Sequence, residues 1–165
     1  MPASLVFILF MSASNVQFAV ASHILTVLAY RNGGYATSRE LAESVQANPT
    51  FVRKTVARLA KAGLLIATRG VTGTCTLAKP PEQISLLEIY KAIEAAPVFS
   101  LHSYPANGSC AVSVNIKDSM QDVLKKTAAG VEEQLASMNL RGLLDNVLAA
   151  EKKAATPVRP SAKVR

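Results

Sequence analysis

The stretch that decides the fold runs from Thr37 to Leu77 and reads TSRELAESVQANPTFVRKTVARLAKAGLLIATRGVTGTCTL. Its pattern predicts a short helix, a turn, a second helix rich in Lys and Arg, and a hairpin marked by glycines. A cationic helix between a turn and a two-stranded hairpin is typical of a winged helix-turn-helix. In that structure the second helix enters the major groove of DNA, so the segment predicts DNA binding.

Residues at the ends of the two predicted helices support this interpretation. Thr37 and Glu40 stand three residues apart, as in a capping box that begins a helix. Asn48 is a suitable N-cap and Pro49 suits a first helical turn, whereas Gly63 is the expected stop. We therefore expect helices over about 38–46 and 49–62, and strands over 64–67 and 74–77.

Further helices are predicted on both sides of this segment, because apolar residues recur at helical spacing over about 14–30 and 85–95. After a loop, a long helix from about Asn115 carries one apolar stripe, and a last short helix follows over 140–149. A stripe of that length outside the first core usually packs against a partner helix, often that of a second copy. The residues predicted to form this homodimer seam are Met120, Val123, Leu124, Val131 and Leu135.

The predicted fold class is mainly α with a small β-hairpin wing, followed by a long C-terminal dimerisation helix. The expected divisions are an N-terminal extension (1–10), a winged helix-turn-helix domain (11–83), a helical dimerisation and sensor region (84–149) and a disordered basic tail (150–165). The apolar first residues are compatible with a targeting signal or with a start at Met11; we favour the latter, because no Lys or Arg precedes the apolar run. The run is too short to span a bilayer, and no membrane partner is expected.

Positive charge is concentrated where DNA would bind. The formal net charge is +7, with a pI of about 9.7. Six Lys or Arg and two Glu lie between Ser38 and Arg69, and five Lys or Arg and one Glu lie in the tail from Glu151, so the rest of the chain is nearly neutral. Such a distribution favours a polyanionic partner, here double-stranded DNA.

Candidate DNA contacts follow from the positions of these residues. Arg53 suits bidentate contact with a guanine, and Thr50 or Phe51 suits contact with a thymine methyl. Ser38 and Arg39 open the preceding helix, where phosphate is readily bound, and Arg69 at the wing tip suits a narrow minor groove. The full candidate set is Ser38, Arg39, Thr50, Phe51, Arg53, Lys54, Arg58, Arg69, Gly70 and Gly73.

Several motifs in this order closely resemble the Rrf-two family of bacterial transcription regulators, which includes the IscR, NsrR and BadM-type proteins. They are Ser38-Arg39-Glu40-Leu41-Ala42, Pro49-x-x-Val52-Arg53-Lys54, Leu59-x-Lys61-Ala62-Gly63-Leu64, Arg69-Gly70-x-x-Gly73 and Ile84-Ser85-Leu86-Leu87-Glu88-Ile89. The resemblance covers about Met11 to Asp145. It implies a winged-helix homodimer, crossed through the long helix, that binds a palindromic operator and usually represses. One departure is Gly73-Thr74-Cys75, where many members have Gly-Gly-Tyr.

The sensor is the part that the resemblance leaves open. Well-known members hold an iron–sulfur cluster on three cysteines before and at the start of the long helix, whereas this region contains Cys110 alone. One thiolate cannot hold such a cluster, so we expect no cofactor. Cys110 is either a small buried packing residue or a redox-responsive thiol. Cys75 is expected to be a packing residue, and His23 a satisfied core or boundary residue rather than a ligand. Two cysteines suit a reducing, cytoplasmic location.

An enzyme is the least supported class, because the chain has no glycine-rich phosphate loop, metal-spaced cluster or catalytic Ser/Cys–His motif. The alternative to a DNA-binding regulator is a winged-helix module for protein assembly, in which the basic face is incidental. A steep salt dependence of binding to duplex DNA would separate these two functions.

Overall fold

The computed structural model describes residues 13–68, 73–94 and 99–155. Its elements are α2 (Ala13–Tyr30), β1 (Ala36–Thr37), α3 (Ser38–Val45), α4 (Pro49–Lys61), β2 (Leu65–Ala67), β3 (Thr74–Leu77), the 3₁₀ helix η1 (Pro81–Gln83), α5 (Leu86–Ala92), α6 (Ala111–Ser137) and α7 (Leu140–Ala155). The mainly helical fold with a small antiparallel sheet confirms the predicted class. The predicted extension 1–10, the start at Met11 and the end of the tail lie outside the described residues.

Helices α3 and α4 begin and end where their capping residues predict. The Thr37 side chain accepts a hydrogen bond from the Glu40 backbone N–H. In return, the Glu40 carboxylate accepts a hydrogen bond from the Thr37 backbone N–H, which completes the capping box. Asn48 caps α4 by accepting a hydrogen bond from the Thr50 N–H. Gly63 follows α4 with a φ of +71°, a left-handed conformation that glycine adopts without a steric penalty.

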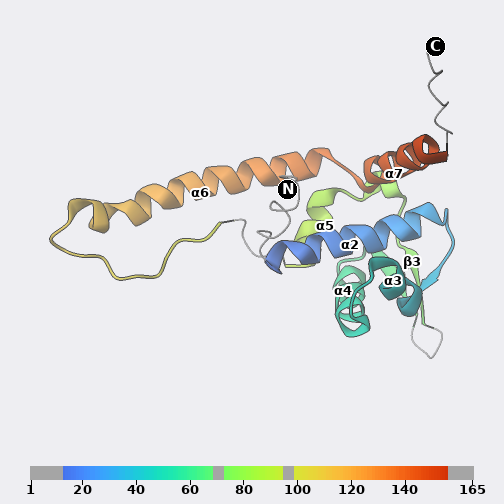
Figure 1. The fold of residues 1–165 in the computed structure, drawn as a ribbon. Coiled ribbons are helices and arrows are strands. Elements are labelled where there is room, and N and C mark those ends of the chain that lie inside the picture. The colour runs from blue at the N-terminus through green and yellow to red at the C-terminus, as the bar shows by residue number, and fades with distance from the viewer. Residues whose placement is uncertain (1–12, 69–72, 95–98, 156–165) are drawn as a thin grey trace, which may run out of the picture.

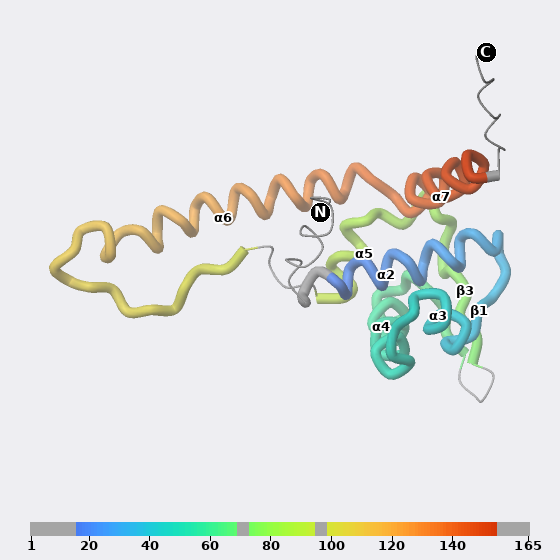
Figure 2. The backbone as a smooth tube through the Cα atoms, viewed as in Figure 1, coloured from blue at the N-terminus to red at the C-terminus, as the bar shows by residue number. Residues whose placement is uncertain are grey.

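The wing is a three-stranded antiparallel sheet in the order β1-β3-β2. Ala67 and Ala36 both pair with Cys75, one from each side. The predicted hairpin is therefore present, but β1 was not predicted, because two residues are too short to show an alternating pattern. Figure 2 shows β1 beside β3. Since Thr37 is both the end of β1 and the N-cap of α3, this strand attaches the start of α3 to the wing.

Helix α2 lies in the middle of the molecule, with α3, α4 and the wing on one side and α5 and α7 on the other (Figure 1). Ile24 and Leu25 of α2 are fully buried, as are Leu59 of α4, Ile89 of α5 and Leu140 of α7, and all belong to one core. The core therefore crosses the predicted domain boundary after residue 83. Helices α5 and α7 both contribute buried residues to this core.

Three helix boundaries differ from the sequence prediction. Helix α5 ends at Ala92 rather than Ala95, and Glu94 has a left-handed φ of +51°. Helix α6 begins at Ala111 rather than about Asn115, and runs through Gly130 without a break. Helix α7 continues past Ala149 to Ala155, because the first tail residues are good helix formers, so the tail was predicted to begin too early.

Helix α6 projects away from the core together with the segment that precedes it (Figure 1). None of its residues is buried. Its C-terminal part is attached through Leu135, which packs against the core, and through an ion pair of 3.0 Å between Lys91 and Glu132. Two backbone hydrogen bonds, Leu86 N–H to Met138 O and Leu140 N–H to Ile84 O, fix the junction with α7. Among the described helices, none has the length and apolarity required to cross a bilayer.

Candidate nucleic-acid interface

Helix α4 has one buried face and one cationic face. Val52, Val56 and Leu59 lie in the core, and the buried Thr55 hydroxyl donates to the Phe51 carbonyl at 3.1 Å. Arg53 and Lys54 are exposed, and neither forms an ion pair with a carboxylate of the described residues. The burial of the apolar side thus leaves two unpaired cations near the N-terminus of α4, the part of a recognition helix that contacts base edges.

The two residues before this pair have different surroundings. Thr50 is exposed in the first turn, with its N–H bound at 2.8 Å by the Asn48 side chain. Phe51 is half-buried and packs against the core. Of the two residues predicted to contact a thymine methyl, Thr50 is therefore fully available, whereas Phe51 has only part of its ring at the surface.

Helix α3 contributes the other side of this face. Arg39 is exposed, and its guanidinium lies 3.8 Å from the Glu43 carboxylate, a loose pair on the helix surface. Arg39, Glu43 and Pro49 line a hollow of about 280 Å³ between α3 and the start of α4. The Ser38 hydroxyl, in contrast, bonds to the Cys75 thiol and joins α3 to β3. The structure brings Arg39 to the same face as the start of α4 and gives Ser38 a contact within the protein.

Arg58 lies in a different environment from the other predicted contacts. Its guanidinium Nη1 donates to the Ile93 carbonyl and to the Gln17 side chain, each at 2.9 Å. These contacts join α4 to the end of α5 and to the first turns of α2. Arg58 lies one helical turn after Lys54, but its guanidinium is engaged by these contacts within the protein, whereas Arg53 and Lys54 have no such partner among the described residues. The spacing along α4 could not reveal this, since the partners of Arg58 are 35 and 41 residues away.

The predicted wing contacts are described only in part. Gly73 lies half-buried just before β3, whereas Arg69 and Gly70 lie outside the described residues. Thr74, which occupies the position where the resembled family has a second glycine, meets Thr68 across the hairpin with their hydroxyl oxygens 3.0 Å apart. Cys75 is 1% exposed, which confirms its packing role, and this burial raises the pKa of its thiol.

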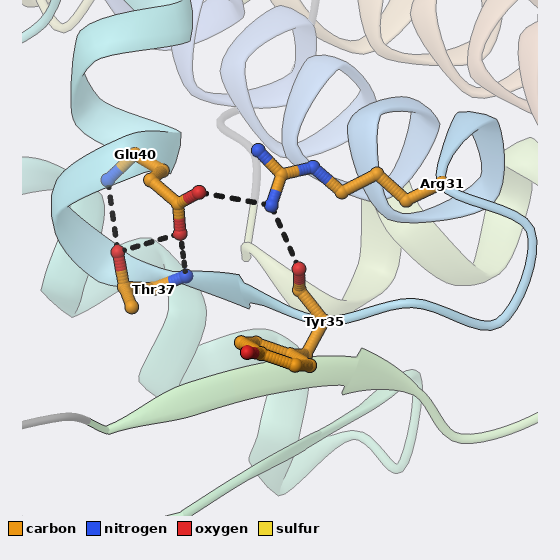
Figure 3. A network of polar contacts seen from close by, with 4 residues as sticks. All are labelled: Arg31, Tyr35, Thr37 and Glu40. Carbon is orange, nitrogen blue, oxygen red and sulfur yellow. Dashed lines mark hydrogen bonds and ion pairs between the residues drawn. The ribbon is translucent and has the colours of Figure 1, made fainter.

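A network of polar contacts fixes the start of α3 (Figure 3). Arg31 Nη1 donates to the Tyr35 carbonyl at 2.7 Å and to Glu40 Oε1 at 3.0 Å. Glu40 Oε2 accepts from the Thr37 backbone N–H at 2.7 Å and from its hydroxyl at 2.8 Å. These hydrogen bonds, those from Thr37 foremost, lower the pKa of Glu40 to about 2. The sequence predicted the Thr37–Glu40 box but gave no signal for Arg31.

The residues around Cys110 do not fit an iron–sulfur cluster. Cys110 is exposed at the N-cap position of α6, and Cys75 is buried in the wing. The described residues contain no group of three His, Cys, Asp or Glu side chains placed to hold a metal ion. Within one chain Cys110 is also not the buried packing residue that one of the two predictions required. His23 lies at the surface of α2 with its Nε2 3.1 Å from the Ser44 hydroxyl, which fits a boundary residue with a hydrogen-bond partner.

Comparisons with known proteins agree with the fold. The Rrf2 family model, described as an iron-dependent transcriptional regulator, matches residues 14–146. YwnA of Bacillus subtilis (strain 168), classed as an HTH-type transcriptional regulator, is 33% identical over 134 residues, which cover 81% of this chain and 98% of YwnA. A crystal structure classed as a DNA-binding protein is 30% identical, with a TM-score of 0.62, and the match covers 78% of this chain and 98% of that protein's chain.

The IscR structure of T. potens has a TM-score of 0.58 at 21% identity and covers 90% of this chain and 93% of its own, a likeness of fold. A family match over most of the sequence, together with a relative similar along nearly all of its length, settles the classification. The chain belongs to the Rrf2 family, whose members are DNA-binding transcription regulators and not enzymes.

Proposed function

We propose that this protein binds a specific DNA sequence through the N-terminal half of α4 and the facing surface of α3. The observation that carries the proposal is the exposure of Arg53 and Lys54, which have no carboxylate partner among the described residues. An unpaired surface cation gains more from a phosphate or a base edge than one that must first break an ion pair.

In this proposal each exposed residue has a separate role. Arg53 reads a guanine through two parallel hydrogen bonds, and Thr50 contacts a neighbouring base edge. Lys54 and Arg39 bind phosphates and fix the position of α4 in the major groove. Arg58 supports the position of α4 through the Ile93 carbonyl and does not contact DNA. Arg69, Gly70 and Gly73 place the wing against the neighbouring groove.

The proposed functional unit is a homodimer joined through α6. Ile116, Met120 and Val123 are exposed on this helix in the single chain, which favours a second copy as their cover. A two-fold symmetric dimer binds a palindromic operator with its two α4 helices. Repression is the action that the family resemblance favours, in the cytoplasm where the chromosome lies.

The test is mapping of bound genomic DNA for the wild type and for Arg53→Ala, followed by anisotropy titrations on the operator found. Loss of a bidentate guanine contact should cost about 1–3 kcal/mol of binding free energy and relax the preference at one base position. Lys54→Ala should weaken binding to all sequences and reduce the slope of log K against log salt by about one.

Lys125→Ala is the control, because it removes the same charge from α6, away from the proposed face. It should leave the sequence preference unchanged. If Arg53→Ala kept the same sites with the same strength, α4 would not be the recognition helix. If wild-type binding to duplex DNA showed no salt dependence, a protein-assembly module would be the better function.

A further inference from the structure

A groove of about 590 Å³ lies between α2, α3 and α7, away from the proposed DNA face. Its lining includes the apolar Val27, Leu143 and Val147 and the polar His23, Arg31 and Ser44. The volume is within the range of about 300–1,000 Å³ that small-molecule sites occupy. A mainly apolar groove with a few converging polar groups is also the usual composition of such sites.

The polar groups of this groove favour an anion. None of the residues that line it is Asp or Glu, whereas Arg31 and His23 are both among them. The contacts of Arg31 within the described residues use Nη1, so Nη2 and Nε remain available for a carboxylate. The two nearby carboxylates are already engaged, Glu40 with Arg31 and Glu151 with the Tyr30 hydroxyl.

One further polar atom in the lining has no partner. The Ser22 hydroxyl oxygen is buried, and no hydrogen-bond partner for it exists among the described residues. A buried hydroxyl without a partner is uncommon in folded proteins, because its desolvation is not compensated. Ser22 lines the groove, but its hydroxyl oxygen is closed to solvent, so a ligand would be held by Arg31 and the apolar lining instead.

We propose that this groove binds a small monocarboxylic acid with an apolar body. The apolar body packs against Val27, Leu143 and Val147, and the carboxylate binds the free edge of the Arg31 guanidinium. Binding reaches the DNA-binding helices through that residue, because the guanidinium that would bind the ligand on its free edge also holds Glu40 through Nη1, and Glu40 caps α3. This consequence rests on the proposed DNA-binding function, and ligand release or binding would then alter operator affinity.

The first experiment measures binding without DNA, by calorimetric titration of the full chain with octanoate, 1-octanol and octylamine. Octanoate should bind saturably, and octylamine should bind more weakly by about tenfold or more, as expected for loss of a charged hydrogen bond. Val147→Trp fills the groove and should weaken octanoate binding by about tenfold or more. Arg31→Gln should weaken octanoate binding but leave 1-octanol binding nearly unchanged.

Ile66→Trp is the matched control, because Ile66 is another exposed apolar residue, on β2 and outside the groove. Equal octanoate binding by the wild type and Val147→Trp would overturn the proposal. An absence of octanoate binding to the wild type would overturn it as well, and a lower assembly mass for Val147→Trp would then show that a second copy of the chain covers the groove.

The second experiment adds octanoate to the protein bound to the operator found by mapping. Wild-type affinity for DNA should fall while that of Val147→Trp stays the same. Octanoate binding without a change in operator affinity would overturn the regulatory step alone. Because the calorimetric titration contains no DNA, failure of the DNA-binding proposal leaves its result intact.

Discussion

At the scale of single residues, the position of α3 depends on Glu40. Its carboxylate accepts two hydrogen bonds from Thr37 and pairs with Arg31, so the end of α2, the strand β1 and the start of α3 meet at one side chain (Figure 3). The contact with Thr37 is local and was visible in the sequence. The contact with Arg31 depends on the tertiary arrangement that brings the end of α2 close to the start of α3. The spacing of residues in the sequence does not predict that arrangement.

The lowered pKa of Glu40 makes this contribution depend on pH. The folded-state pKa is about 2, against an ordinary value of 4.5, so the ionised form is favoured by folding. The stabilisation is complete above about pH 4.5 and is lost as the pH falls toward 2. Glu40→Gln should lower the free energy of unfolding at neutral pH, and its difference from the wild type should shrink over that interval. Urea unfolding followed by circular dichroism at a series of pH values measures this difference.

Glu43→Gln is the control for Glu40→Gln, since it removes a carboxylate from the same helix without altering the network. A difference between the wild type and Glu40→Gln that stayed constant from pH 5 to pH 2.5 would contradict the role assigned to Glu40, since the folded-state pKa is about 2. The same result for both variants would attribute the effect to the net charge of α3.

At the scale of elements, the sequence predicted what is local and missed what is tertiary. The ends of α3 and α4 depend on Thr37, Asn48 and Gly63, whose caps act within a few residues, and they lie where predicted. The strand β1 exists only because β3 lies beside it. Arg58 was placed on the DNA face by its spacing, but its partners come from α2 and α5.

Two glycines in different helical positions, one after the end of α4 and one inside α6, should respond in opposite ways to replacement by alanine. At both Gly63 and Gly130 an added Cβ would meet no atom within 4 Å, so steric contacts are equal. Gly63 has a φ of +71°, whereas Gly130 lies inside α6. Gly63→Ala should therefore destabilise the protein by about 1–2 kcal/mol, and Gly130→Ala should stabilise it by about 0.5–1 kcal/mol. Chemical denaturation of both variants measures these changes, and equal effects of the same sign would contradict the assignment.

At the scale of the whole molecule, α6 is a helix with several large apolar side chains that stay exposed in a single chain. Val131 and Leu135 of the predicted seam are half-buried, and Leu135 packs against the core, so the C-terminal end of the stripe already has a cover within the chain. Met120 and Val123, nearer the N-terminal end, remain exposed. The predicted seam therefore divides into two surfaces, and the proposed contact with a second copy concerns the exposed N-terminal one.

A charge at the exposed end of the stripe should test the homodimer directly. Val123 is 53% exposed in the single chain, so Val123→Glu should leave the fold intact but place a carboxylate in the proposed seam. Sedimentation should show a dimer for the wild type and a monomer for the variant at the same concentration. Because two linked half-sites bind far more tightly than one, operator affinity should fall by about 10²-fold or more while the urea midpoint changes little.

Ala129→Glu supplies the control for this last step, since it adds the same charge to an exposed position on the face of α6 away from the stripe. It should remain dimeric with full operator affinity. If Val123→Glu stayed dimeric, the exposed apolar residues of α6 would not form the seam, and the two α4 helices would have to be spaced on a palindrome by some other surface. If the variant were monomeric yet bound the operator as tightly as the wild type, each chain would read its half-site alone, and α6 would serve assembly rather than recognition.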